Sequence, residues 1–475
     1  MSGIEKGTLW LFVSNIAFFL SSFLLYFFLG RFLLSVEDFG IFTVIISLVS
    51  VLTTTMTQGL QQSIAKFISA SPQIAGLIRK KMIVYQTLID LFLFVIYFGI
   101  ADLLGIIFND PTLVPFFRLS ALLLLFHPLL GVIMGVFNGL KQFSKQAFFA
   151  IFFNILKMAL ILALVWIGWN IEGAIWGFVL ASAIGILIGI AITRVKEQGI
   201  NFSFKPLFYF AIPMIVFTLM LNLLQNIDLF AVKALSAEAS NALSGNYSIA
   251  ATLARIPATL ILAVSTVALP LISETIAKKN LEKTRFYIKE SVRYSLLFLV
   301  FCAAIIAAKP DALVELIFSS KYMAAHYALF ILAFAYVFFG LFQLLSTIIA
   351  ASGQPQKPLI IAVLSFVISF ALNQILIILF SIQGAAIASL IAMFIAFALS
   401  AGLVLKKFKA LVSIKSAGKI FLSGLLVFTI LSVLGISGLL LIPAYIAMLL
   451  LYAACLFVLK EIKRQDIDVF FNMIK

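Results

Sequence analysis

Long apolar runs separated by short polar connections make up almost the whole chain. Each run is close to the roughly 20 residues that a helix needs to cross a bilayer. Membrane β-barrels show weaker alternating segments of about ten residues instead, so these runs predict an all-α polytopic membrane protein. We expect about fourteen transmembrane helices, at residues 9–33, 39–65, 82–108, 113–138, 147–168, 173–193, 207–232, 246–272, 291–308, 327–351, 359–380, 384–405, 417–436 and 439–459.

Composition supports this prediction and leaves no room for a soluble domain. The 475 residues are 64% hydrophobic and only 11% charged, whereas soluble domains are about 45–50% apolar and 25% charged. Every connection between the predicted helices is short, so no loop is large enough to build a catalytic surface. Cys302 and Cys455 lie inside apolar runs and offer no metal spacing. We therefore expect no enzyme activity, no metal and no cofactor.

The net charge of +15 reflects membrane topology. Most of the 33 Lys and Arg residues fall on one side of the predicted helices, as in the segment 277–290. By the positive-inside rule this side is cytoplasmic, and both termini lie there, which agrees with an even number of helices. The distribution argues against a nucleic-acid partner and favours contact with membrane lipid.

The chain also contains an internal repeat. Residues 38–52 correspond to 243–257, residues 138–142 to 352–356, and residues 170–182 to 381–393, with offsets of about 205, 214 and 211 residues. One duplication of six helices explains them. Parallel repeats are a known transporter plan, with the substrate site at the interface between the halves. We predict a six-helix lobe at 1–200, a second at 201–410, and two additional helices with a cytoplasmic tail at 411–475.

Several short motifs resemble those of the polysaccharide transporter group. They are the stretch from Arg31 to Gly40, Gly245-Asn246-Tyr247, the turn ASGQPQKP at 351–358, and the Gly-Ala pairs at 173–174 and 384–385. This group belongs to the multidrug/oligosaccharidyl-lipid/polysaccharide exporter superfamily, with O-antigen (Wzx-type) and lipid II flippases. The resemblance implies two six-helix lobes in a V around a central cavity, and transport of a lipid-linked oligosaccharide. It also implies that the two additional helices line a groove for the lipid tail.

Basic side chains inside the predicted helices are candidates for substrate binding, because ionisable groups in a membrane are costly. Lys157 lies deepest, about 15 Å from the predicted helix start at 1.5 Å per residue. Arg255 lies within the eighth helix, and Arg118 and Arg31 lie nearer the external surface. Such cations suit phosphate groups. The alternative for Lys157 is a structural ion pair with Asp90 or another carboxylate.

Polar uncharged residues recur along several helices. We interpret these residues as the lining of a wet cavity that accommodates sugars. The alternative is ordinary hydrogen bonding between helices. Asp228 and Asp90 could couple transport to protons or sodium, or serve as salt-bridge partners of Lys157 or Arg255. The predicted cavity-lining residues are Asn154, Asn222, Gln225, Asn226, Gln58 and Asn373.

Together these features predict a flippase that moves a polyprenyl-diphosphate-linked oligosaccharide from the cytoplasmic to the external leaflet of the cell membrane. Polysaccharide polymerases or glycosyltransferases are the expected protein partners. One alternative is a multidrug exporter of the same superfamily, although such exporters handle cations. A less favoured alternative is a membrane glycosyltransferase or polymerase, but the chain has no D-x-D, P-loop or nucleophile-elbow motif.

Overall fold

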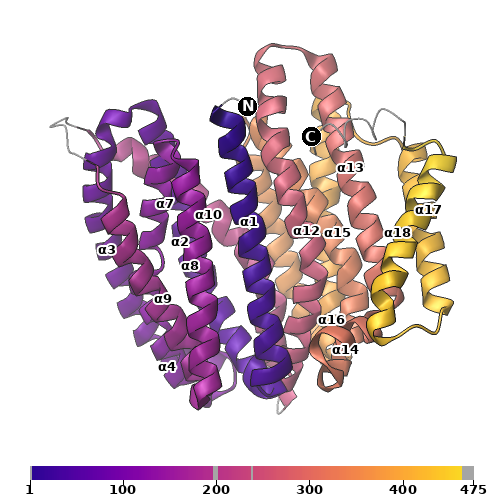
Figure 1. Ribbon diagram of the computed structural model, residues 1–475, viewed down its shortest axis with the longest axis horizontal. Helices are drawn as coiled ribbons and strands as arrows, with labels where there is room; N and C mark the ends of the chain where they lie inside the picture. The colour runs from indigo at the N-terminus through magenta and orange to yellow at the C-terminus, as the bar shows by residue number, and fades with distance from the viewer. Residues whose placement is uncertain (1–2, 196–201, 237–238, 463–475) are drawn as a thin grey trace. The chain divides into compact units, whose positions relative to one another are not determined.

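The computed structural model describes residues 3–195, 202–236 and 239–462, with side chains except at 3–9, 12, 262–271 and 277. Eleven stretches are long and apolar enough to cross a membrane. Two of them, Phe143–Ile192 and Gln356–Phe408, each hold two helices folded back on one another. Counting these as pairs and adding the 38-residue helix Ser240–Ala277, the described residues form fourteen helices or helical stretches long enough to cross a membrane, in agreement with the predicted number. The predicted fold class of a multi-pass, all-helical membrane protein is confirmed (Figure 1).

The helices extend beyond the apolar runs, because their ends continue into polar connections. The predicted cytoplasmic ends, Met1 and residues 463–475, lie outside the described residues. The elements up to the end of the sixth crossing are α1 Gly3–Phe28, η1 Leu29–Leu33, α2 Val36–Ala70, η2 Pro72–Ile74, α3 Ala75–Gly99, α4 Ala101–Ile107, η3 Pro111–Leu113, α5 Val114–Ser120, α6 Leu122–Phe126, α7 Leu129–Gly139, α8 Phe143–Leu164, η4 Val165–Trp169 and α9 Asn170–Ile192. The remaining elements are α10 Lys205–Leu224, α11 Ile227–Leu235, α12 Ser240–Ala277, α13 Leu281–Ala308, α14 Pro310–Phe318, η6 Ser320–Ala325, α15 His326–Ala351, α16 Gln356–Phe408, α17 Ile414–Val433, η7 Gly438–Leu440 and α18 Leu441–Val458.

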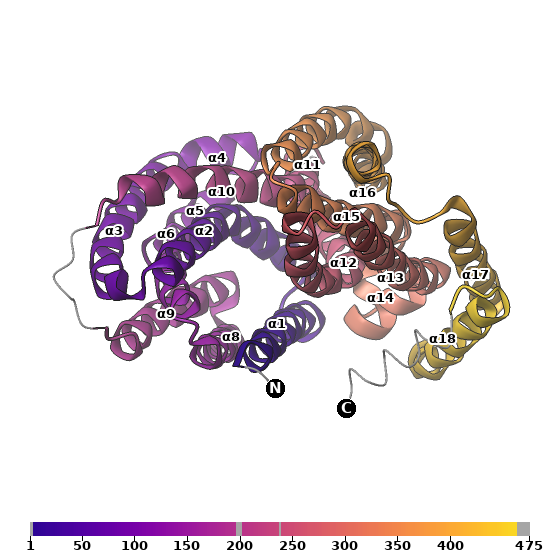
Figure 2. The same cartoon turned by 90° about the horizontal axis from the view of Figure 1, so that it is seen from above.

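The chain forms two compact units, residues 1–245 (unit 1) and 246–475 (unit 2). Their boundary lies 45 residues beyond the predicted lobe boundary at residue 200. The reason is that α10 packs along α2 (Figure 2), where Gly59 leaves room for Ile215. The seventh crossing is therefore grouped with unit 1, and the lobes defined by the repeat stay a prediction.

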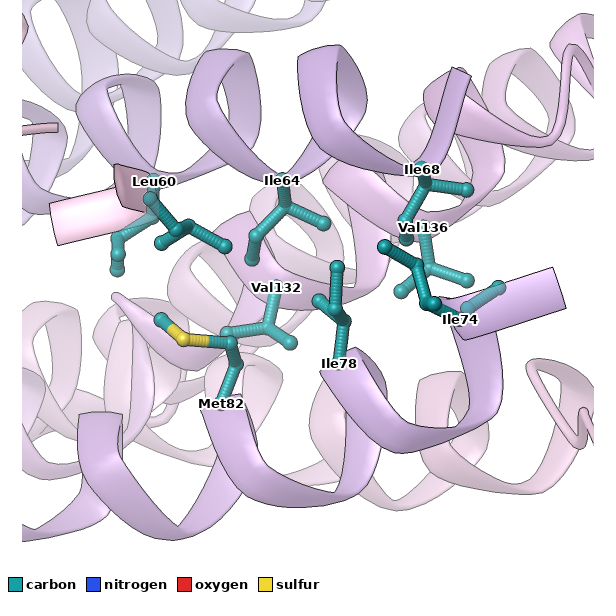
Figure 3. Packing of buried hydrophobic residues seen from close by; sticks show 10 residues of the cluster. Leu60, Ile64, Ile68, Ile74, Ile78, Met82, Val132 and Val136 are labelled. Carbon is teal, nitrogen blue, oxygen red and sulfur yellow. The ribbon is translucent and has the colours of Figure 1, made fainter. Parts of the chain in front are cut away.

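The core of unit 1 is made of aliphatic side chains from four helices. Figure 3 shows Leu60 and Ile64 of α2 facing Val132 of α7 and Met82 of α3, and Leu207 of α10 joins the same cluster. All five side chains are at most 2% exposed. Since lipid is as apolar as these side chains, close packing rather than the hydrophobic effect holds such helices together.

The internal repeat is visible in the backbone. Asn170 (φ 43°, ψ −129°) and Ser381 (φ 52°, ψ −135°) occupy corresponding positions of the repeat and have the same unusual conformation. Each reverses the chain between two consecutive crossings. Gly177 then packs against the backbone of Ile161 on the partner helix, which allows the two helices to approach closely.

Gly40 and Gly245, a second pair of repeat positions, contact one another in unit 1. A Cβ atom on Gly40 would lie 1.9 Å from the carbonyl oxygen of Asn241 and 2.8 Å from the amide nitrogen of Gly245. A Cβ atom on Gly245 would lie 2.3 Å from the carbonyl oxygen of Val36. The first turns of α2 and α12 thus touch backbone to backbone, which only glycine permits.

Helices α17 and α18, the additional pair, lie at the edge of unit 2 (Figures 1 and 2). Tyr452 of α18 donates a hydrogen bond to the carbonyl oxygen of Leu297 on α13 (3.0 Å). Beyond α18, the buried Glu461 accepts a hydrogen bond from Ser416 of α17, and its carbonyl oxygen accepts one from Arg293 of α13 (2.7 Å). These bonds fasten the additional pair to α13.

Candidate functional site

Lys157 lies near the middle of a membrane crossing. Helix α8 begins at Phe143, four residues earlier than predicted, and continues through η4 to Trp169. At 1.5 Å per residue, Lys157 is about 21 Å from the start of α8, compared with the predicted 15 Å, because the helix begins earlier. The side chain is half-buried. An ammonium group at this depth in a membrane crossing is costly.

Three aromatic rings surround the Lys157 ammonium. Its Nζ atom lies 5.2 Å from the ring centre of Phe178 on α9, 5.7 Å from that of Phe18 on α1, and 5.9 Å from that of Phe153. Within the described residues it makes no hydrogen bond or ion pair. Ring faces attract a cation more weakly than a carboxylate does, so the charge remains available to an anionic ligand. The sequence could not predict which rings surround Lys157, because the chain has 50 Phe residues and no motif distinguishes these three.

The predicted alternative, an ion pair between Lys157 and Asp90, is wrong. Asp90 is fully buried on α3 and accepts a hydrogen bond from Gln86 Nε2 (2.6 Å). His127, which follows α6, is the titratable neighbour of Lys157. Its Nδ1 atom lies 3.3 Å from Ser182 Oγ, and its ring packs against Phe178.

Five of the six amides predicted to line a cavity donate a hydrogen bond within their own helix. Each side-chain N–H group points to the carbonyl oxygen four residues earlier in the chain. Because that carbonyl can only accept, the amide nitrogen must face it, and the amide oxygen points away from the backbone. The bonds are Asn154 to Ala150 (2.8 Å), Asn222 to Thr218 (2.9 Å), Gln225 to Leu221 (3.3 Å), Asn226 to Asn222 (2.7 Å) and Asn373 to Ser369 (2.8 Å).

These amides differ in exposure. Asn222, Gln225 and Asn226 of α10 and its C-terminal end are half-buried. The side-chain oxygens of Asn222 and Asn226 accept no hydrogen bond within the described residues. Asn154 and Asn373 are at least 95% buried. Buried amides of this kind stabilise their own helix and are poor candidates for direct contact with a substrate.

Arg255 of α12 lies deeper in its helix than expected, because α12 begins at Ser240 and continues without a break through Pro257. Its Nε atom donates to the hydroxyl of Tyr336 on α15 (3.0 Å), and its guanidinium lies 5.7 Å from the centre of the same ring. Tyr336 is 1% exposed, whereas Arg255 is half-buried. A buried tyrosine thus holds the guanidinium in a fixed place in unit 2.

The remaining predicted site residues lie closer to a surface or serve local structure. Arg118 forms an exposed ion pair with Asp102 (2.8 Å), and Arg31 is half-buried in η1. Gln58 is exposed. Asp228 is 1% exposed and accepts a hydrogen bond from the backbone N–H of Leu229 (2.8 Å) in the first turn of α11.

A buried polar cluster around Lys233 was not predicted, because residue 233 lies just beyond the predicted helix at 207–232. The Lys233 side chain is fully buried at the end of α11. Its ammonium donates hydrogen bonds to Asp110 (2.7 Å), Ser240 (3.0 Å) and the side-chain oxygen of Asn241. Asn109 also donates to the carbonyl oxygen of Ala234 (2.9 Å). No spacing in the sequence relates these residues, which come together only in the folded unit 1.

The Lys233 cluster predicts a loss of stability in acid. Burial raises the pKa of Asp110, but hydrogen bonds from Lys233 and Thr112 and the charge of Lys233 outweigh it, so the net pKa is lowered. The stabilisation is therefore complete above the ordinary carboxyl pKa of about 3.9 and is lost as the pH falls below it. We expect Asp110→Asn to lower the thermal midpoint at neutral pH, and this difference from wild type to shrink in acid. A difference that does not change with pH would contradict an ionised Asp110.

Comparison with known proteins places this arrangement in a family. Residues 4–276 match the family model described as polysaccharide biosynthesis protein, which is more than half of the chain. The chain belongs to the polysaccharide biosynthesis protein family. The predicted resemblance to the polysaccharide transporter group is thereby confirmed. Residues 213–375 of this family member also match the MatE model. Among proteins of curated function, no sequence matches the chain.

Solved structures show the same fold for this polysaccharide biosynthesis family member. The lipid II flippase MurJ in its inward closed conformation matches with a TM-score of 0.78 and 16% identity over 95% of this chain and 98% of MurJ. An inward-facing multidrug resistance MATE transporter matches with a TM-score of 0.64 and 14% identity over 87% and 96%. A MATE transporter from Vibrio cholerae gives 0.61 and 16% over 86% and 99%. The chain thus shares the fold of the lipid II flippase MurJ and of MATE transporters.

Proposed function

We propose that this protein is a flippase that carries a polyprenyl-diphosphate-linked oligosaccharide from the cytoplasmic to the external leaflet by alternating access. The observation that carries this proposal is the Lys157 ammonium, which lies mid-way through a membrane crossing among aromatic rings and forms no ion pair with a carboxylate of the described residues. A diphosphate would supply the missing negative charge, and lysine binds phosphate as a point charge. The family and the fold of the lipid II flippase MurJ support the same substrate class.

The other candidate residues take complementary roles in this proposal. Arg255, held by Tyr336, is a second phosphate-binding cation. Arg31 and Arg118 are placed to contact the headgroup late in transport, and Arg118 would first leave Asp102. The half-buried oxygens of Asn222 and Asn226 accept hydrogen bonds from sugar hydroxyls, and Gln225 belongs to the same lining. Gln58 joins this lining, and Asn154 and Asn373 support it from buried positions.

The proposal also includes topology and partners. Both termini face the cytoplasm, and the protein resides in the cell membrane, as the distribution of Lys and Arg predicts. The six-helix lobes at 1–200 and 201–410 move against one another, and the additional pair at 411–475 lines a groove for the lipid tail. Asp228 and Asp90 are the candidates for ion coupling. Polysaccharide polymerases or glycosyltransferases act before and after the flippase and are its expected partners.

A second candidate function is export of small molecules, which the MatE match to residues 213–375 favours. Exporters of organic cations need acidic or aromatic surfaces in the membrane. The aromatic rings at Lys157 could serve this purpose only if the lysine were neutral or displaced. The positive charge at this position therefore favours an anionic substrate.

The test is transport by the purified protein in proteoliposomes. A polyprenyl diphosphate carrying a radiolabelled disaccharide is placed in one leaflet, and its appearance in the other is followed by cleavage with an added glycosidase that cannot cross the membrane. We expect protein-dependent exposure of the label, and no release of sugar or phosphate when the glycosidase is omitted. Sustained release by the protein alone would indicate an enzyme. Export of a cationic dye without movement of the lipid would indicate a multidrug exporter.

A further inference from the structure

Gln86 and Asp90 form an isolated polar pair one turn apart on α3. Both side chains are 0% exposed. Gln86 Nε2 donates to Asp90 Oδ1 (2.6 Å). The two remaining oxygens, Asp90 Oδ2 and Gln86 Oε1, are buried and have no hydrogen-bond partner within the described residues. Since buried polar atoms are nearly always satisfied, two orphaned oxygens on adjacent turns call for an explanation.

An ionised Asp90 would be a buried charge without compensation. Removing a carboxylate from water costs several kcal/mol after relaxation unless a cation or several donors replace the lost hydration. Asp90 has one neutral donor, Gln86, and it forms no ion pair in the described parts of the chain.

The helices packed against α3 offer no cation to Asp90. Helices α6 and α7 contain no ionisable side chain. His127, between them, is directed to Ser182. The charged groups of α4 and α5, Asp102 and Arg118, pair with one another at the surface.

The charged groups of α2 and α3 lie toward the ends of these helices. On α2, Glu37 and Asp38 are in the first turn, and the Lys66 ammonium lies 3.6 Å from the ring centre of Phe210. On α3, Arg79 donates to Ile190 and Thr193. Its neighbours Lys80 and Lys81 are also in the first two turns.

A single proton on Asp90 would remove the uncompensated charge and would also give the two oxygens a hydrogen bond. If Oδ2 of Asp90 carries hydrogen, it becomes the donor that Gln86 Oε1 lacks, while Gln86 Nε2 continues to donate to Oδ1. A carboxylic acid and a primary amide then form a closed ring of two complementary hydrogen bonds with no net charge. We propose that Asp90 is a neutral carboxylic acid paired with Gln86, and that this pair is a proton-binding site within the membrane. The proposal rests on the buried pair and does not depend on the proposed substrate.

The test is infrared difference spectroscopy of the purified full-length protein in lipid nanodiscs at neutral pH. A protonated carboxyl group has a separate C=O stretching band, which shifts when water is exchanged for heavy water. We expect this band in the wild type and complete loss of it in Asp90→Asn. Asparagine supplies an N–H group where the acid supplied O–H, so this variant keeps both hydrogen bonds and is expected to fold with an unchanged thermal midpoint.

Two further variants separate a specific pair from a general effect. Asp228→Asn, at a second buried acid of unit 1, should leave the band in place. Gln86→Leu should shift the band toward the frequency of an acid without hydrogen bonds. A wild-type spectrum without the band, or a band that persists in Asp90→Asn, would overturn the proposal.

Discussion

Lys157→Met is expected to reduce transport of the lipid-linked glycan to the background of protein-free vesicles, while the protein still inserts and folds. Methionine keeps an apolar stem among the three aromatic rings and removes only the ammonium. A hydrogen bond to a charged group contributes about 1.5–3 kcal/mol. At 1.4 kcal/mol per factor of ten, its loss weakens substrate binding by about 10- to 100-fold. Transport in proteoliposomes and the thermal midpoint in detergent are the two measurements.

Stability should not fall in this variant, because no carboxylate loses a partner when the ammonium is removed. Two controls test whether the charge and its position matter. Lys157→Arg keeps a cation that suits phosphate and should retain measurable transport. Lys145→Met removes an exposed lysine near the start of the same helix and should transport at the wild-type rate. Wild-type transport by Lys157→Met at equal protein density would contradict the phosphate-binding role.

Gly40→Ala is expected to prevent normal folding of unit 1. The added Cβ atom would lie 1.9 Å from the Asn241 carbonyl oxygen. Since the helical backbone fixes the positions of the Cβ atom and of the carbonyl oxygen, no side-chain rotation relieves the overlap, and the helices must move apart. We expect a loss of about 3 kcal/mol in the free energy of unfolding, at the upper end of the range for overpacking. Yield of monodisperse protein and the thermal midpoint report this loss.

Gly402→Ala is the matched control for this substitution. Gly402 lies in α16, and a Cβ atom there would meet no atom within 4 Å. Alanine also favours the helical conformation over glycine by up to about 1 kcal/mol. The control should therefore be as stable as wild type or more so. Equal stability of Gly40→Ala and Gly402→Ala would show that α2 and α12 do not touch at this point.

Most of the fold could be predicted because the membrane imposes it. An apolar run of sufficient length must form a helix to satisfy its backbone, so the fourteen crossings follow from the sequence. The repeat could be predicted because the same local signals, such as Asn170 and Ser381, recur at matching positions. Helix ends could not be placed as well. Helices α8 and α12 begin at Phe143 and Ser240, and their first turns contain polar residues that lie outside the apolar runs.

The candidate site was predicted less completely, because ion pairing depends on which faces of different helices meet. The depth of Lys157 follows from its position in the chain, but its aromatic neighbours come from α1, α8 and α9. The pairing of Asp90 with Gln86 has a readable signal, the spacing of four residues on one helix. No such sequence signal exists for Lys233, because tertiary packing alone brings its partners Asp110 and Asn241 close to it.

The amides that bond to their own helix have a mechanical consequence. A hydrogen bond between two helices must break when the helices slide past one another, and in lipid no water replaces it. Asn222 and Asn226 complete a bond within their own backbone, so a sliding step at this face breaks none of these bonds. The energy barrier to sliding this helix past its neighbours is therefore low. The amide oxygens can accept hydrogen bonds from a substrate during the same movement.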